Sequence, residues 1–265
     1  MTNASSLDMR LRQIAFAAHD LDAVLDQLDA AFGLRAGYED PAIIHYGLRN
    51  IVIPIGGEFL EIVQPVQEGS SAGRYLARRG GDSGYMVILQ AEDALTHRAR
   101  MSAAGVQIVD VIDHEEHQCS HFHPREFGGV LASIDAAPGV ADWREADSFW
   151  HPAGHDWQRF KTGLVQGIAS VTIASVDPAE NAARWGRMLN VQPRQSDGAL
   201  CIDLLRGAAI RFVPLGPEGP SGIVGMDVLA ADPDVILSRA RAAGLNMDGD
   251  AVTICNVTIH VKRAC

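Results

Sequence analysis

The sequence predicts an α+β protein built from four βαβββ modules, each with a strand, a helix and three further strands. Three observations support this class. One pattern of apolar and polar residues occurs four times along the chain, each expected helix follows an aspartate, and the apolar spacing changes from helical to strand-like within every repeat. The length of 265 residues suits one large domain or two smaller ones.

The first module begins with an apolar strand at residues 12–17. Asp20 then provides a helix cap, and apolar residues from 21 to 32 recur at nearly the helical period. Two strands follow at residues 50–55 and 58–63, joined by a Gly-Gly pair that is typical of a tight hairpin turn.

The second module begins with a strand at residues 84–89. We expect its helix over residues 93–104, with Gly105 at the end of the helix. The strands expected after this helix are residues 107–112, 118–123 and 130–134.

The last two modules begin with strands at residues 168–174 and 222–229. An Asp-Pro pair follows each strand, at 177–178 and 232–233, and this pair favours a helix start because aspartate caps the helix and proline suits its first turn. The later strands are expected at residues 199–204, 209–213, 252–254 and 257–261.

These modules predict two domains and a connecting segment. We expect an N-terminal domain over residues 1–140 and a C-terminal domain over residues 164–265. The connecting segment, residues 141–163, contains Trp143, Trp150 and Trp157 and is too apolar for a free linker. It is expected to pack on the domains, either to cover a sheet edge or to form a lid over a pocket.

Composition limits the partners that the chain suits. The net charge of −11 disfavours nucleic acid and anionic membrane surfaces, although a pocket for a small anion remains compatible with it. No apolar run reaches the about 18 residues of a membrane span, and residues 1–10 do not read as a secretory signal. The four cysteines lack C-x-x-C spacing, so we expect reduced thiols and a cytoplasmic protein.

Three strings of sequence carry a family resemblance. They are GEFLEIVQP at residues 57–65, FHPREFGGVL at residues 122–131, and the strand and helix start at residues 11–22. With the four-module pattern, they resemble the vicinal oxygen chelate superfamily, which includes glyoxalase I, methylmalonyl-CoA epimerase, extradiol dioxygenases and bleomycin-resistance proteins. The resemblance covers the N-terminal half and, more weakly, the C-terminal half.

The resemblance implies two tandem glyoxalase-like domains, each folded as a cup. In that superfamily the first and fourth strands of each module supply ligands to one divalent metal, commonly two histidines and one or two glutamates. An open coordination position lets such a metal act as a Lewis acid.

Few of the implied metal ligands are present in this chain. In the N-terminal half the corresponding positions hold Gln13, Glu61, Tyr85 and Ser133, of which only Glu61 is a strong ligand. In the C-terminal half they hold Ser170, Arg211, Val224 and His260. An arginine would oppose a cation, so the C-terminal half is expected to be degenerate and the N-terminal half to hold the functional pocket.

His121 and His123 offer a displaced metal site. Both are expected on one strand and on one face of it. With Glu61 and Gln13 they would supply two imidazoles and one carboxylate, a set that suits iron or manganese, with zinc or nickel as further candidates. Alternatively, the two histidines bind substrate, transfer protons or serve the structure alone. His114 and His117 are expected in a solvated acidic loop.

Other polar residues are candidates for catalysis or substrate binding. Glu61 lies between apolar neighbours, so burial is expected to raise its pKa and make it a usable general base. Arg125 suits a bidentate grip on a carboxylate. The remaining substrate-binding candidates are Tyr85, Gln13, Ser133, His45 and Asn50.

Three functions remain open at this point. The first is a lyase- or isomerase-type enzyme in which Glu61 moves a proton next to a carbonyl, with His121 or His123 as its partner. The second is a metal-free protein of the bleomycin-resistance type that binds or sequesters a small molecule, for which we expect a carboxylate or an aromatic compound. The third is an extradiol-type dioxygenase, which needs two histidines and a glutamate that neither half has at the standard positions. A homodimer is compatible with all three functions.

Overall fold

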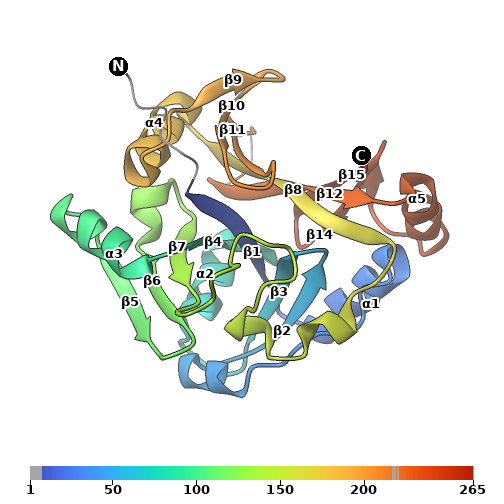
Figure 1. Ribbon diagram of the computed structural model, residues 1–265. Coiled ribbons are helices and arrows are strands. Elements are labelled where there is room, and N and C mark those ends of the chain that lie inside the picture. Colours follow the sequence, from blue (N-terminus) through green and yellow to red (C-terminus); the bar gives the residue numbers. More distant parts are fainter. Residues whose placement is uncertain (1–7, 217–218, 220, 265) are drawn as a thin grey trace. The chain divides into compact units, whose positions relative to one another are not determined.

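The computed structural model describes residues 8–216, 219 and 221–264, and Figure 1 shows its elements. The strands form a seven-stranded sheet in the order β2-β3-β1-β4-β7-β6-β5 and an eight-stranded sheet in the order β13-β14-β15-β12-β8-β11-β10-β9. The predicted α+β class is confirmed. Among the described residues, none of the helices combines the length and apolar character needed to cross a bilayer.

The bounds of the elements follow the predicted modules. The strands of the first sheet are β1 (Met9–Ala17), β2 (Leu48–Ile55), β3 (Glu58–Pro65), β4 (Ser83–Ala91), β5 (Ile108–Asp113), β6 (Gln118–Phe122) and β7 (Leu131–Ala136). Those of the second are β8 (Val165–Ser175), β9 (Arg194–Ser196), β10 (Ala199–Asp203), β11 (Ala209–Pro214), β12 (Gly222–Ala230), β13 (Met247–Asp248), β14 (Ala251–Ile254) and β15 (Val257–Arg263). The helices are α1 (Leu21–Phe32), α2 (Ser71–Arg79), α3 (Ala94–Ala103), α4 (Pro178–Leu189) and α5 (Pro233–Ala242), with short 3-10 helices η1 (Pro41–Tyr46), η2 (Pro124–Phe127), η3 (His151–Ala153) and η4 (Trp157–Phe160).

Contacts within the chain define two compact units. The Glu61 unit contains residues 13–85, 150–169 and the chain from 224 onward, and the Asp135 unit contains the chain up to residue 12, residues 86–149 and residues 170–223. The Glu61 unit therefore combines the first and fourth modules, and the Asp135 unit combines the second and third. The domain boundaries at residues 140 and 164 stay a prediction.

The four helices predicted from an aspartate begin where expected. The side chains of Asp20, Asp93, Asp177 and Asp232 each accept a hydrogen bond from a backbone N–H in the first turn of α1, α3, α4 and α5. Such caps satisfy donors that the helix itself leaves unpaired. Helix α2 was not predicted, because its sequence offers only Ala72, Tyr75 and Leu76 as a buried face.

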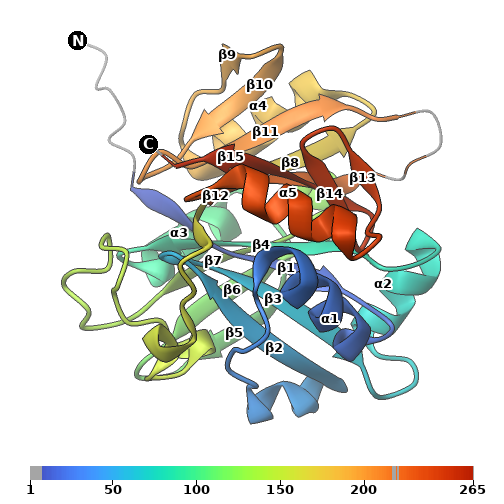
Figure 2. The same cartoon turned by 90° about the vertical axis from the view of Figure 1, so that its right-hand side faces the viewer.

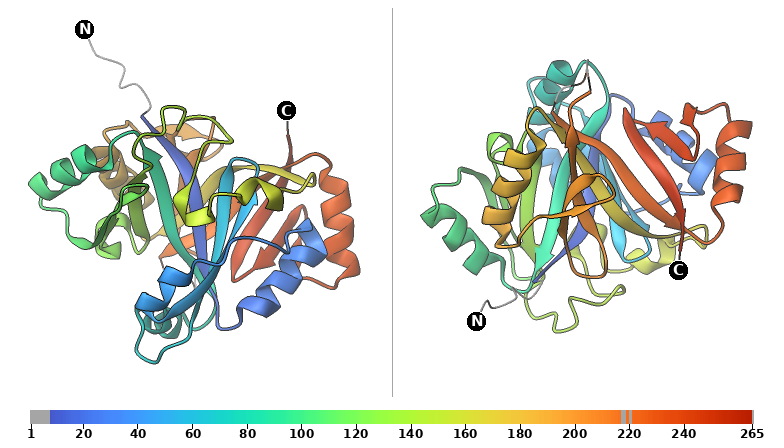
Figure 3. Two further views of the ribbon diagram at one scale, coloured as in Figure 1. Left: turned by 60° about the horizontal axis from the view of Figure 1, so that its bottom comes forward. Right: turned by 90° about the horizontal axis from the view of Figure 1, so that it is seen from above.

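In the Glu61 unit, β2 and β3 form the predicted hairpin, and β3 runs parallel to β1 with Ala15 opposite Glu61. Helices α1 and α5 lie side by side (Figures 2 and 3). Arg239 of α5 donates to the carbonyls of Asp29 and Ala30 near the end of α1, over 2.6 and 3.0 Å. A cation at that end satisfies unpaired carbonyls and complements the helix dipole.

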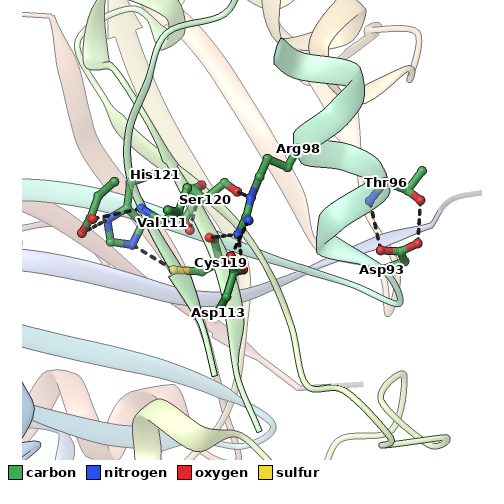
Figure 4. A network of polar contacts seen from close by, with 10 residues as sticks. Asp93, Thr96, Arg98, Val111, Asp113, Cys119, Ser120 and His121 are labelled. Atoms are coloured by element: carbon green, nitrogen blue, oxygen red, sulfur yellow. Dashed lines mark hydrogen bonds and ion pairs between the residues drawn. The ribbon is translucent and has the colours of Figure 1, made fainter. Parts of the chain in front are cut away.

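In the Asp135 unit, β4 runs parallel to β7, and β7, β6 and β5 are antiparallel. Arg98 of α3 donates to Ser120 over 2.6 Å and to both carboxylate oxygens of Asp113 over 2.7 and 2.9 Å (Figure 4). Because side chains alternate along a strand, Cys119 and His121 lie on the sheet face opposite the side chain of Ser120.

The connecting segment packs, as predicted. Trp143 belongs to the Asp135 unit, and Trp150 and Trp157 belong to the Glu61 unit; all three are at most 2% exposed. The buried Arg10 donates to the carbonyls of Trp143 and Glu145 over 3.1 and 2.6 Å. A guanidinium has five N–H groups, so it can hold an irregular backbone in this way. A lid role for the segment stays a prediction.

Candidate functional site

Glu61 lies at the centre of a buried polar cluster. Its side chain is on β3, and the residue is 7% exposed. One carboxylate oxygen accepts from the amide of Gln13 over 2.8 Å, and the other accepts from the amide of Asn50 over 2.7 Å. The two donors come from β1 and β2, the strands on either side of β3, because the register places all three side chains on one sheet face.

Two further contacts orient these amides. The indole N–H of Trp150 donates to the side-chain oxygen of Gln13 over 2.9 Å. The backbone N–H of Asp40 donates to the side-chain oxygen of Asn50 over 3.0 Å. Each amide thus accepts at its oxygen and directs its NH2 group at Glu61. We call Glu61, Gln13, Asn50 and Trp150 the Glu61 network.

Tyr85 adds a neutral phenol to the Glu61 unit. Its ring packs against Tyr75 with the centroids 4.9 Å apart. Burial raises the pKa of Tyr85 to about 12, with Tyr75 and Glu61 adding to the rise and Arg78 and Arg74 opposing it. Tyr85 therefore keeps its proton at neutral pH and can donate a hydrogen bond.

The divalent metal that the family resemblance implies does not fit the Glu61 network. Gln13 and Asn50 direct N–H groups at Glu61, and these donors have no lone pair for a cation. In the second module, Ser133 lies opposite Ile88, as Glu61 lies opposite Ala15 in the first. Gln13 is two positions before Ala15, and Met86 is two positions before Ile88. The counterpart of Gln13 is therefore Met86 and not Tyr85. A thioether and a hydroxyl are poor ligands for a hard cation. We derive no step through a metal at these positions.

The two candidate histidines of the second module have different surroundings. Strand β6 ends at Phe122, and His123 caps η2, its ring nitrogen accepting from the backbone of Arg125 over 3.2 Å. The expectation that His121 and His123 share one strand is wrong, because Pro124 cannot donate to a ladder and starts a 3-10 helix. Burial lowers the pKa of His121, with Asp135 and Asp110 opposing this. A metal site with Glu61, His121 and His123 stays a prediction.

The other predicted binding residues divide by exposure. Arg125 is on the surface, its side chain 66% exposed and paired with Glu126 over 3.0 Å. His45 is exposed on η1, where its ring meets the edge of Tyr46. Ser133 is buried, and its hydroxyl donates to Asp135. Their roles in substrate binding stay predictions.

A second buried cluster, which was not predicted, lies in the Asp135 unit. His117, predicted to be solvated, is 8% exposed, and its Nε2 lies 2.8 Å from a carboxylate oxygen of Asp135. Cys119 lies directly opposite Asp135 in the ladder, and burial raises the pKa of its thiol, with Asp135 adding to the rise. The polar residues alternate along both strands, a signal that was present in the sequence.

Comparison with known proteins gives the family context. A family model described as a glyoxalase-like domain matches residues 14–189. An ethylmalonyl-CoA/methylmalonyl-CoA epimerase from Cereibacter sphaeroides is 25% identical over 130 residues, which are 48% of this chain and 96% of the relative.

Two solved structures resemble nearly the whole chain. A hypothetical protein from Staphylococcus aureus has a TM-score of 0.67 at 11% identity, covering 97% of this chain and 100% of the other. A mutant of 4-hydroxymandelate synthase from Streptomyces coelicolor has a TM-score of 0.66 at 14% identity, covering 90% of this chain and 76% of the other. At these identities the likeness concerns the fold, and it agrees with the predicted pair of tandem domains.

Proposed function

The chain belongs to the glyoxalase-like domain family, within the vicinal oxygen chelate superfamily, and from this premise we propose that it is an isomerase- or lyase-type enzyme acting on a small molecule. The observation that carries the proposal is the Glu61 network. In this network a buried carboxylate accepts one neutral N–H donor at each oxygen.

The proposed chemistry is proton transfer at a carbon next to a carbonyl. The two amides hold both carboxylate oxygens of Glu61 by hydrogen bonds without adding charge, and Glu61 is the proposed base. The C–H bond breaks, its proton passes to Glu61, and its electron pair forms an enolate. Protonation of the opposite face of the enolate gives an isomerase reaction. If the neighbouring carbon carries a leaving group, the enolate pair forms a C=C bond, the group departs with its bonding electrons, and the reaction is that of a lyase. The neutral phenol of Tyr85 is a suitable donor to the enolate oxygen.

The first substrate to test comes from the epimerase relative, whose name specifies ethylmalonyl-CoA and methylmalonyl-CoA. In these esters the acidic carbon lies between two carbonyl groups, which suits a carboxylate base. Roles for His121, His123 and Arg125 in the same reaction, a cytoplasmic location and a homodimer stay predictions.

The test is solvent hydrogen exchange. The protein is incubated in deuterium oxide with methylmalonyl-CoA and with a panel of other CoA esters and 2-hydroxy or 2-oxo acids, and deuterium in the small molecule is measured by mass spectrometry. We expect exchange with one class of compound, reduced about 100-fold or more in Glu61→Gln, since general base catalysis contributes about that much.

Glu58→Gln is the matched control. Glu58 is also buried on β3, three positions before Glu61, and its carboxylate accepts from the backbone of Ile168 over 3.3 Å. A glutamine oxygen can accept this bond, so exchange should persist. Equal exchange in wild type and Glu61→Gln would rule out the proposed role of Glu61.

A metal-free binding protein is the second candidate. It is favoured by the aromatic side chains of the Glu61 unit. The rings of Trp157 and Phe59 are T-shaped, with their centroids 4.9 Å apart, and Trp150 donates to Gln13. This candidate predicts quenching of tryptophan fluorescence by a compound of the panel without any exchange. The Glu61 network does not suit the metal that an extradiol-type dioxygenase needs, because the amides of Gln13 and Asn50 direct N–H groups at the carboxylate.

A further inference from the structure

Four metal-ligating side chains gather in the Asp135 unit, and none of them belongs to the Glu61 network. A ring nitrogen of His117, Sγ of Cys119 and a carboxylate oxygen of Asp135 all lie within 4.8 Å of one another. Nε2 of His121 lies 3.6 Å from Sγ of Cys119, a contact drawn in Figure 4. We call these four residues the Asp135 cluster.

Strand pairing explains why these side chains meet. In the β6–β7 ladder Cys119 lies opposite Asp135, and His121 lies opposite Ser133. Residues two apart on a strand share a face, so the side chains of Cys119, His121 and Asp135 lie on one face of the sheet. Arg98 binds Ser120 on the opposite face. His117 precedes β6 and reaches Asp135 from the end of the strand.

From this geometry we propose that the Asp135 cluster binds one zinc-type divalent cation, with His117, Cys119 and Asp135 as ligands and His121 as the fourth. Thiolate, imidazole and carboxylate are the ligand types that zinc takes. At zinc–sulfur and zinc–nitrogen bond lengths of about 2.3 and 2.0 Å, two tetrahedral ligands lie about 3.5 Å apart. The 3.6 Å between Cys119 and His121 is close to this value, whereas the 2.8 Å between Nε2 of His117 and the carboxylate of Asp135 would lengthen when the cation binds.

Two neighbouring side chains support the assignment. The hydroxyl of Ser133 donates to the second oxygen of Asp135 and so orients the carboxylate, as the outer contacts of metal ligands commonly do. Gln90 pairs with Asp135 across the β4–β7 ladder and is 0% exposed. Neither polar atom of its amide has a hydrogen-bond partner among the residues that the structure describes, so this buried amide is available for an outer contact to the ligands of the cation.

A cysteine nucleophile is the alternative role for this cluster. The imidazole of His121 lies between a thiol and a carboxylate, as in a catalytic triad. Its Nε2 is 3.6 Å from Sγ of Cys119, and its Nδ1 is 3.8 Å from a carboxylate oxygen of Asp110. However, Cys119 is fully buried, so a substrate has no direct approach to its sulfur. Burial suits a metal ligand, since structural sites are closed to solvent. Binding would release the thiol proton to solvent.

The test uses cobalt as a spectroscopic probe. The full chain is stripped with a chelator and titrated with Co²⁺, and the thiolate-to-cobalt charge-transfer band and the bound metal are measured. We expect about one ion per chain with a thiolate band, which Zn²⁺ then removes by displacement. Cys119→Ser and His117→Gln should each weaken Co²⁺ binding about 100-fold or more, and Ser133→Ala about 10-fold or more, as for outer contacts.

Two control variants show whether the band arises at the Asp135 cluster. Cys201→Ser removes another buried thiol of the same unit and should leave the band unchanged. Glu61→Gln should also leave it unchanged, so the metal site and the proposed base are tested independently. Absence of a thiolate band in the wild-type chain would overturn the proposal whatever the variants do. Retention of the ion in a folded Cys119→Ser variant, or its loss in Glu61→Gln, would overturn it as well.

Discussion

Trp150 donates its indole N–H to the side-chain oxygen of Gln13 over 2.9 Å, although 137 positions separate the two residues in the sequence. Gln13 in turn donates to Glu61. The connecting segment is thus linked to the carboxylate by two successive hydrogen bonds. Each of these bonds fixes the orientation of the next group, so a change at Trp150 should be felt at Glu61.

Replacing Trp150 by phenylalanine tests this link. The ring is largely kept, but the buried oxygen of Gln13 loses its donor, which should lower the free energy of unfolding by about 1 kcal/mol or more. Exchange activity should fall as well. Trp157→Phe is the matched control, because the indole N–H of Trp157 has no hydrogen-bond partner in the described part of the chain. Urea unfolding that shows equal losses in the two variants would contradict the prediction.

Asn50→Asp should place a second carboxylate beside Glu61. Near pH 7 the loss of the N–H donor and the repulsion should cost about 3 kcal/mol. The shared site then has a pKa above its unfolded value, so the folded state binds more protons and its stability falls as pH rises through that pKa. The loss of unfolding free energy in Asn50→Asp should therefore be smaller at pH 4 than at pH 7.

Urea unfolding at several pH values measures this dependence. Asn256→Asp is the control, since Asn256 is exposed and its amide donates to the backbone of Asp82 over 2.9 Å. Its free energy of unfolding should change little. A loss in Asn50→Asp that is equal at pH 4 and pH 7 would show that charge repulsion is not its cause.

Features that depend on neighbours in sequence were predictable. The caps at Asp20 and Asp177 act on backbone N–H groups three positions away, so the residue type and its place before an apolar repeat suffice. The same holds for the strand that carries Glu61. Helix α2 has a cap of the same kind at Ser70, but no apolar repeat follows this cap, because most of the helix residues are small or cationic.

Features that depend on register and long-range packing were not predictable. The acidic neighbours of His117 suggested a solvated loop, but its partner Asp135 is 18 positions away on another strand. The role of Asn50 depends on the β2–β3 register, and that of Trp150 on the path of the connecting segment. The end of β6 at Phe122 follows from one proline, which the expected pairing of His121 and His123 did not take into account.

Gly56→Ala should separate backbone strain from steric conflict. Gly56 has φ of +66°, and a Cβ there would lie 1.9 Å from the carbonyl oxygen of Gln166 in the same unit. Gly249 has φ of +59°, with nothing within 4 Å of its Cβ position. Gly249→Ala should cost about 1 kcal/mol for its positive φ, and Gly56→Ala about 2 kcal/mol more, because the packed backbone near Gln166 must move. Similar unfolding free energies for both variants would contradict the close packing at Gly56.

The raised pKa of Tyr85 predicts a specific loss of stability in alkali. Burial raises this pKa to about 12, whereas a tyrosine in the unfolded chain has a pKa of about 10. Between these values the folded state keeps a proton that the unfolded state has lost, so the free energy of unfolding falls as pH rises from about 10 to 12. Below about pH 10, ionisation of Tyr85 does not reduce the free energy of unfolding, because both states keep the proton. Tyr85→Phe should flatten this slope, and the tyrosinate absorbance of the wild type minus that of the variant should show one group ionising near pH 12. A difference spectrum that rises near pH 10 instead would place Tyr85 in water, where its phenol would lack the environment proposed for a donor to an enolate.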